Sequence, residues 1–82
     1  MKLTEKEIEV KVINVVSSQL QIDHSEIELN SLFKDDLGAD SLDLTELTIG
    51  FEDEFAIEIP DSDFDQLISV STVVEYMKKR LA

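Results

Sequence analysis

One serine hydroxyl lies among several carboxylates in the segment DLGADSLDLTEL, residues 36–47. A serine acts as a catalytic nucleophile only when a nearby base takes its proton and hydrogen-bond donors stabilise the oxyanion. The single histidine, His24, is far from Ser41 in the sequence, and G-A-D-S-L differs from the hydrolase pattern G-x-S-x-G. The neighbouring carboxylates would also oppose a developing negative charge. We therefore do not expect Ser41 to activate itself.

The residues that follow Ser41 predict that it stands at the start of a helix. Asp40 and Ser41 are both good N-cap residues, and Gly38 permits a tight turn before them. A helix N-terminus favours a bound phosphate, whereas an ordinary N-cap is worth about 1 kcal/mol to the helix. The local pattern alone favours the N-cap interpretation. Apolar residues at spacings of three and four predict a helix over about 41–55: Leu44, Leu47, Phe51 and Phe55.

The acidic segment DSDFD, residues 61–65, imitates the start of a calcium-binding EF-hand loop. The match ends there, because Gln66 replaces the glycine that the turn requires and Thr72 replaces the bidentate glutamate. We therefore expect no dedicated metal site, and weak binding of divalent cations by the clustered acids stays open. A catalytic carboxylate pair is equally unexpected, because a small helical bundle offers no deep cleft to tune two pKa values.

Charge is unevenly distributed along the chain. Nineteen acidic residues face seven basic ones, and thirteen of the acids lie between Asp35 and Met77, a stretch without Lys or Arg. This distribution disfavours nucleic acid and anionic membrane surfaces as partners and favours proteins with basic patches. The alternative interpretation is that the acids only keep a small protein soluble.

Composition predicts one small cytoplasmic domain over 1–82, and we expect a monomer. The chain has no cysteine, so it forms no disulfide and supplies no thiol of its own. Its start, MKLTEKEIEV, lacks the apolar stretch of a signal peptide, and no apolar run is long enough to span a membrane.

The remaining periodicities predict an all-α fold, a small bundle of three main helices plus one short helix. The first helix is expected over about 4–19 with a Thr4–Glu7 capping box, and the last begins after Ser69 or Ser71. A short helix is expected at about 61–67. The long connection over 21–40 carries enough apolar residues to pack on the core, and a helical turn around Ser31 to Phe33 stays open.

The segment DLGADSLDLTELTIGFEDEFAIEIPD, residues 36–61, closely resembles the central part of acyl carrier proteins, and the resemblance covers most of the chain. It implies that Ser41 is esterified by 4′-phosphopantetheine, which a phosphopantetheinyl transferase donates from coenzyme A. The terminal thiol of this arm carries acyl intermediates as thioesters. The absence of cysteine and of a base beside Ser41 agrees with an added thiol and an external transferase.

The resemblance also implies a docking face for basic partner enzymes and an apolar core or acyl cavity. The docking residues by position are Asp40, Leu42, Asp43, Glu46, Ile49, Glu52 and Asp53. The core or cavity residues by position are Phe33, Leu47, Phe51, Ile59, Leu67, Val73 and Tyr76. Four residues depart from what is common in the family: Thr45 and Thr48 replace bulkier aliphatic residues, Gly50 replaces alanine, and Phe64 replaces a small residue.

The resulting interpretation is a carrier of acyl thioesters in fatty-acid biosynthesis that is not itself an enzyme. Its partners would be the transferase and fatty-acid synthesis enzymes with basic docking patches. One alternative is a specialised carrier of the same fold for polyketide, amino-acyl or modified-lipid synthesis. Another is an acidic, ion-responsive interaction module without a prosthetic group.

Overall fold

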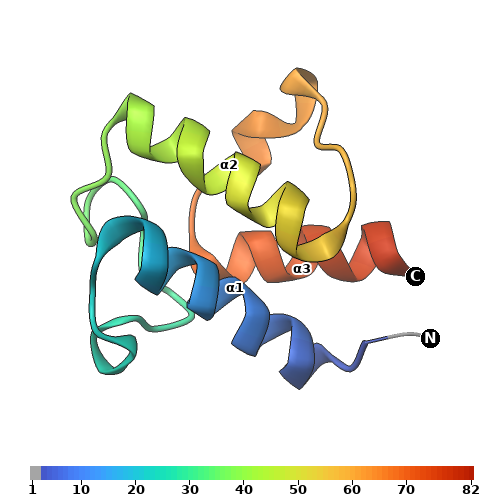
Figure 1. The fold of residues 1–82 in the computed structure, drawn as a ribbon, viewed down its shortest axis with the longest axis horizontal. Coiled ribbons are helices and arrows are strands. Elements are labelled where there is room, and N and C mark those ends of the chain that lie inside the picture. The colour runs from blue at the N-terminus through green and yellow to red at the C-terminus, as the bar shows by residue number, and fades with distance from the viewer. Residues whose placement is uncertain (1–2) are drawn as a thin grey trace.

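The computed structural model describes residues 3–82 as helices joined by loops (Figure 1). Residues 3–82 contain no strand beyond one isolated antiparallel bridge, between Leu32 and Ser69. The prediction of three main helices and a short one is confirmed, and a second short 3-10 turn is added to them. The elements in chain order are α1 Glu5–Leu20, η1 His24–Glu26, α2 Ser41–Phe55, η2 Asp61–Gln66 and α3 Val70–Leu81.

The α-helices begin where the sequence supplies caps. The backbone N–H of Glu7 donates to Thr4 Oγ1 at 3.1 Å, and the backbone N–H of Thr4 donates to Glu7 Oε1 at 2.8 Å. This is the capping box predicted for the first helix. Ser69, and not Ser71, caps α3 by accepting the N–H of Thr72 at 3.3 Å. The helix boundaries therefore follow from local hydrogen bonds that the sequence already indicates.

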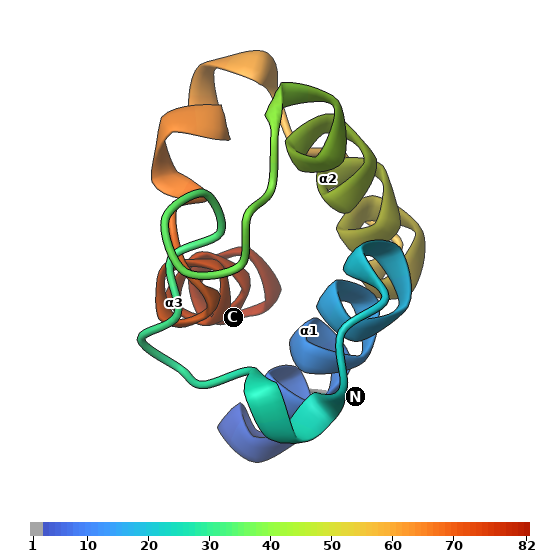
Figure 2. The ribbon, with the colours of Figure 1, turned by 90° about the vertical axis from the view of Figure 1, so that its left-hand side faces the viewer.

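Helix α1 packs against both α2 and α3, and Figures 1 and 2 show it beside each of them. Within the described residues, the backbones of α2 and α3 do not approach each other closely. Buried side chains fill the core between the elements, among them Phe33 from the long loop and Phe51 from α2, each 1% exposed. Helix α2 is therefore held by α1 on one side and by loop and η2 side chains on another.

The connection over 21–40 is packed, as its apolar residues predict, because Ile27, Phe33 and Ala39 are buried. The turn expected around Ser31 to Phe33 begins at Leu32, whose carbonyl accepts the N–H groups of Asp36 at 2.9 Å and Leu37 at 3.1 Å. The same segment is bonded to the region before α3, because the N–H of Phe33 donates to the carbonyl of Ile68 at 3.1 Å and the carbonyl of Ser31 accepts the N–H of Val70 at 3.2 Å. A separate short 3-10 turn forms at η1, where the Asp23 side chain accepts the N–H of Ser25.

Gly50 lies where α2 meets α1. A Cβ atom built on Gly50 would stand 2.8 Å from Val15 Cγ1, well inside van der Waals contact. Gly costs about 1 kcal/mol against Ala in a helix interior, so the sequence alone indicates only a weakened helix. The structure adds the reason for this cost, because the missing side chain lets the two helices come together.

We expect Gly50→Ala to lower the free energy of unfolding by about 1 kcal/mol. Overpacking against the stiff Val15 side chain costs roughly 1–3 kcal/mol, which outweighs a gain of about 1 kcal/mol in helix propensity. In a Val15→Ala background the clash is gone, and Gly50→Ala should then be stabilising. Urea denaturation of the four proteins measures this change of sign. Equal stabilisation in both backgrounds would show that Gly50 does not set the helix contact.

Candidate functional site

Ser41 is the first residue of α2, and its hydroxyl takes no part in capping. Asp40 is the N-cap, and its carboxylate accepts the N–H of Asp43 at 2.8 Å while Asp43 accepts the N–H of Asp40 at 3.0 Å. The N-cap interpretation of Ser41 is therefore wrong, because its neighbour already fills that role. Ser41 is exposed, and its hydroxyl makes no hydrogen bond to residues 3–82.

The capping box leaves specific donors at the start of α2. A helix begins with backbone N–H groups that have no partner within the helix. Those of Asp40 and Asp43 are used by the capping box, so those of Ser41 and Leu42 remain for an external acceptor. An esterified phosphate on Ser41 could receive them. The two nearby carboxylates oppose a tight phosphate site and favour an arm that stays mobile.

The one histidine is engaged elsewhere. His24 Nε2 lies 2.8 Å from Asn14 Oδ1, and its Nδ1 lies 3.3 Å from Ser17 Oγ, which joins η1 to α1. These contacts occupy both ring nitrogens on the α1 side of the molecule. They agree with the expectation that Ser41 has no base of its own.

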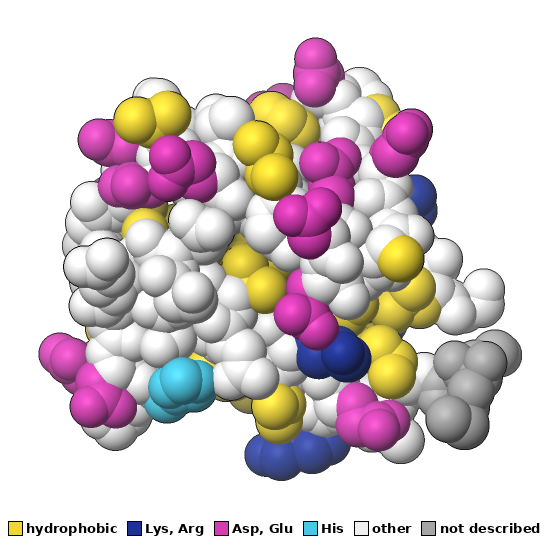
Figure 3. All heavy atoms as spheres, viewed as in Figure 1, with side chains coloured by type: hydrophobic (Ala, Val, Ile, Leu, Met, Phe, Trp, Pro, Cys, Tyr) yellow, Lys and Arg dark blue, Asp and Glu magenta, His cyan; other side chains and the backbone are white. Residues whose placement is uncertain are grey.

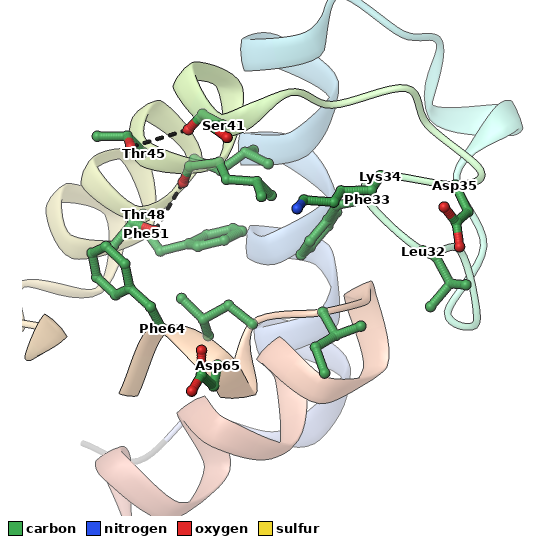
Figure 4. Close-up of a pocket in the computed structure, with 14 residues that line it drawn as sticks. Leu32, Phe33, Lys34, Asp35, Ser41, Thr45, Thr48, Phe51, Phe64 and Asp65 are labelled. Atoms are coloured by element: carbon green, nitrogen blue, oxygen red, sulfur yellow. Dashed lines mark hydrogen bonds between the residues drawn. The ribbon is translucent and has the colours of Figure 1, made fainter. Parts of the chain in front are cut away.

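A cavity of about 700 Å³ adjoins Ser41, between α2, the loop after Ser31 and η2 (Figure 4). Four of the predicted cavity residues line it, namely Phe33, Leu47, Phe51 and Leu67. The other three predicted residues, Ile59, Val73 and Tyr76, are buried in the core and do not line the cavity. The remaining lining residues are Leu32, Lys34, Asp35, Ser41, Leu44, Thr45, Thr48, Phe64, Asp65 and Ile68.

Polar groups interrupt the apolar wall of the cavity. Thr45 Oγ1 donates to the Ser41 carbonyl at 3.1 Å, and Thr48 Oγ1 donates to the Leu44 carbonyl at 2.9 Å. Figure 4 shows both hydrogen bonds along α2. Lys34 is the only basic residue among those described as lining the cavity. Sequence reasoning identified the threonines as unusual for the family but could not assign them to the cavity wall.

The predicted docking residues form an exposed stripe on α2. Leu42, Glu46, Ile49 and Asp53 follow one another at spacings of four, three and four, which brings them to one helix face. Leu42 is 66% exposed and Ile49 is 52% exposed, unusually high for large apolar residues. Figure 3 shows acidic and hydrophobic side chains gathered over α2, whereas the Lys and Arg side chains visible there lie mostly over α1. We call these four residues the α2 stripe.

The other predicted docking residues also have structural contacts. Asp40 and Asp43 form the capping box of α2. Glu52 is half-buried, and its carboxylate accepts the backbone N–H of Ile59 at 2.7 Å. This bond ties the segment after α2 back to the helix, so Glu52 has a structural contact that its position in the sequence does not reveal.

Comparison with known proteins adds independent information about this site. A protein-family model described as "Phosphopantetheine attachment site" matches residues 10–77. The acyl carrier protein of Clostridium acetobutylicum is 50% identical over 68 residues, which cover 83% of this chain and 88% of that protein. The acyl carrier protein of Cyanidioschyzon merolae is 45% identical over 75 residues, which cover 92% of this chain and 82% of that protein.

The chain belongs to the acyl carrier protein family. Acyl carrier proteins carry a covalent 4′-phosphopantetheine group and are carriers, not enzymes. The residues present fit such a group. The hydroxyl of Ser41 at the start of α2 is exposed, takes no part in capping the helix and lies beside a cavity with a largely apolar lining. The chain supplies no thiol, and the group would supply one.

Two structural observations concern other features that the sequence raised. No helix among residues 3–82 combines the length and the apolar character needed to cross a membrane. The described part of the chain also contains no group of three or more His, Asp or Glu side chains placed to hold a metal ion.

Two successive side-chain hydrogen bonds fix η2, which forms one wall of the carrier's cavity, to α3. Tyr76 Oη donates to Asp63 Oδ2 at 2.6 Å and accepts a hydrogen bond from Arg80 Nη1 at 2.8 Å. Burial raises the pKa of Tyr76 above its ordinary value, and the hydrogen bond to Asp63 acts in the same direction. The phenol therefore stays protonated at neutral pH and keeps donating to Asp63.

Proposed function

We propose that Ser41 carries the 4′-phosphopantetheine group and that the protein shuttles acyl thioesters in fatty-acid biosynthesis. The observation that carries the assignment is the position of the Ser41 hydroxyl. This hydroxyl is exposed and lies at the edge of the cavity, and it takes no part in capping α2 because Asp40 is the N-cap. Ser41 has no base of its own, so a phosphopantetheinyl transferase must deprotonate it when it transfers the group from coenzyme A.

The residues of the chain then have separate tasks. The Asp40–Asp43 capping box holds the first turn of α2, so that Ser41 is presented at a defined point. The phosphopantetheine group supplies the thiol that forms thioesters with acyl chains. Tethering through Ser41 raises the local concentration of the acyl chain at each partner's active site. The cavity shelters part of the acyl chain while the carrier moves between partner enzymes.

The α2 stripe is the proposed docking surface for the transferase and the synthesis enzymes. Its apolar members, Leu42 and Ile49, offer contact area, and Glu46 and Asp53 attract basic patches. Attraction between exposed charges speeds encounter and weakens with salt, which suits a protein that must release each partner. The proposed carrier acts as a monomer in the cytoplasm, where its net charge of −12 opposes self-association.

Fatty-acid synthesis is favoured over a specialised pathway by the lining of the cavity. Leu47, Phe51, Leu67 and Phe33 provide an apolar surface suited to an aliphatic chain. An amino-acyl group is charged and short, and it would gain little from such a surface. A carrier for polyketide or modified-lipid synthesis is the second candidate, which the hydroxyls of Thr45 and Thr48 in the cavity wall keep in consideration.

Loading of the phosphopantetheinylated protein tests fatty-acid synthesis against an amino-acyl pathway. We expect a malonyl transferase of fatty-acid synthesis to add one malonyl group from malonyl coenzyme A, seen as an increase in intact mass that hydroxylamine removes. The protein without phosphopantetheine is the control and should gain nothing. Loading by an amino-acid adenylating enzyme, with none by the malonyl transferase, would contradict the pathway and leave the carrier role intact.

A further inference from the structure

The cavity wall contains one buried hydroxyl whose hydrogen is already committed. Thr48 is 6% exposed and lines the cavity on the same face of α2 as Leu44 and Phe51. Thr48 Oγ1 donates its proton to the carbonyl of Leu44 at 2.9 Å (Figure 4). A hydroxyl has one donor and two acceptor lone pairs, so Thr48 can accept a hydrogen bond while it keeps the bond to Leu44, but it can donate to a guest only by rotating away from Leu44.

An acceptor in an apolar wall discriminates between guests by their polar groups. A guest hydroxyl can donate to Thr48 and can satisfy both polar groups at once. A guest carbonyl can bond to Thr48 only if the hydroxyl turns away from Leu44, so the guest carbonyl loses water without a net gain in hydrogen bonds. A saturated chain lies between these cases, because it brings no polar group that must be desolvated.

Thr48 is also placed where a chain tethered at Ser41 would pass. The two residues are seven positions apart on α2, which corresponds to about 10 Å along the helix axis. Ser41 and Thr48 line the same cavity, and the half-buried Leu44 lies between them on this face. The phosphopantetheine arm between Ser41 and the thioester is longer than this distance when extended, so it can deliver the first part of an acyl chain in the cavity to Thr48.

We propose that the cavity favours hydroxyacyl chains over the corresponding oxoacyl and saturated chains, and that Thr48 sets this preference. The inference rests on the proposed function, since it requires a chain tethered at Ser41. The selected guest is an acyl chain with a hydroxyl near the thioester, and the recognition is one hydrogen bond from that hydroxyl to Thr48 Oγ1.

Neighbouring polar residues do not produce the same selectivity. Lys34 lines the cavity but is exposed, and its ammonium group can donate equally to the oxygen of a hydroxyl or of a ketone. Thr45 also bonds to a backbone carbonyl, but its side chain is exposed and remains hydrated. The carboxylates of Asp35 and Asp65 also accept hydrogen bonds, but both side chains are exposed and remain hydrated. Thr48 is therefore the acceptor that combines burial with a place in the cavity wall.

The test uses protein with phosphopantetheine attached, confirmed by intact mass, and loaded with 3-hydroxyoctanoyl, 3-oxooctanoyl or octanoyl chains. Sheltered thioesters react slowly with hydroxylamine, so the reaction rate reports how much of each chain is exposed. Each rate is compared between the wild type and Thr48→Val, which removes the hydroxyl at nearly constant shape. This ratio cancels the intrinsic reactivity of each thioester.

We expect Thr48→Val to raise the rate at which hydroxylamine cleaves the hydroxyoctanoyl thioester roughly two- to tenfold. This is the change that the loss of one net hydrogen bond gives. The octanoyl ratio should stay near one, and the oxooctanoyl ratio should change less than the hydroxyoctanoyl ratio. Thr48→Ser keeps the hydroxyl and should restore the wild-type order. Ser18→Ala is the control, because it removes an exposed hydroxyl of α1 that does not line the cavity, and it should leave all three rates unchanged.

The outcomes separate this inference from the carrier proposal. If Thr48→Val changes all three rates alike, or if Ser18→Ala produces the same changes, the preference does not come from Thr48 and the inference is overturned. The carrier proposal would stand in both cases, because all three chains were loaded. Failure of the wild type to gain phosphopantetheine would overturn the carrier proposal and the inference with it.

Discussion

Ser41→Ala should gain no mass when it is incubated with coenzyme A and a phosphopantetheinyl transferase, whereas the wild type should gain one phosphopantetheinyl group. The loss is expected to be complete, because the substitution removes the oxygen that forms the ester. Folding should be unaffected, since Ser41 is exposed and Asp40 supplies the cap. Intact-protein mass spectrometry measures the gain, and circular dichroism checks that the variant is helical.

Ser62→Ala is the matched control for this substitution. Ser62 is exposed and is flanked by Asp61 and Asp63, so it resembles Ser41 in its accessibility and in its acidic neighbours. It lies in the short η2 element and not at the start of an α-helix. The control should gain one group as the wild type does. A wild type that gains nothing would instead favour the acidic interaction module.

Reversing two charges of the α2 stripe, in Glu46→Lys with Asp53→Lys, should lower kcat/KM for phosphopantetheine transfer by about ten- to hundredfold at low salt. Charged clefts and patches change encounter rates by factors of this size. Both side chains are exposed and make no hydrogen bond among the described residues, so the fold should tolerate the change. The rate of mass gain at several salt concentrations measures the effect.

The matched control reverses the same number of charges outside the stripe. Glu26 and Glu28 are exposed and lie in or just after η1, within the long loop. Glu26→Lys with Glu28→Lys has the same net charge as the stripe variant and should stay within about twofold of the wild type. Equal losses in the two variants would mean that net charge, and not the α2 stripe, directs docking. The difference between the variants should also shrink as salt rises.

The parts of the fold set by local sequence were predictable, and those set by distant contacts were not. Helix α2 follows from its apolar spacing, and its observed bounds match the predicted 41–55. The strand-like segment at Ser31 to Phe33 depends on hydrogen bonds to Ile68 and Val70, more than thirty residues away. No local pattern contains that information, so the sequence could indicate a turn near these residues but not their attachment to the region before α3.

The site shows the same division. Ser41 was identified from its surroundings and from resemblance, but two adjacent residues could each serve as the cap, and only the hydrogen bonds to Asp43 decide for Asp40. Thr48 and Gly50 were visible as departures from the family. Their meaning required the positions of Leu44 and Val15 relative to them, which a linear pattern does not supply.

The position of the attached group is the most direct test of the proposed carrier. Trypsin is poorly suited, because the chain has no Lys or Arg between 35 and 77, and one long peptide would hold several serines. A Glu-specific protease should release residues 29–46, in which Ser31 is buried and Ser41 is exposed. Fragmentation of this peptide from modified wild-type protein should locate the phosphopantetheinyl mass on Ser41. Its location on any other residue would contradict the assignment of the site.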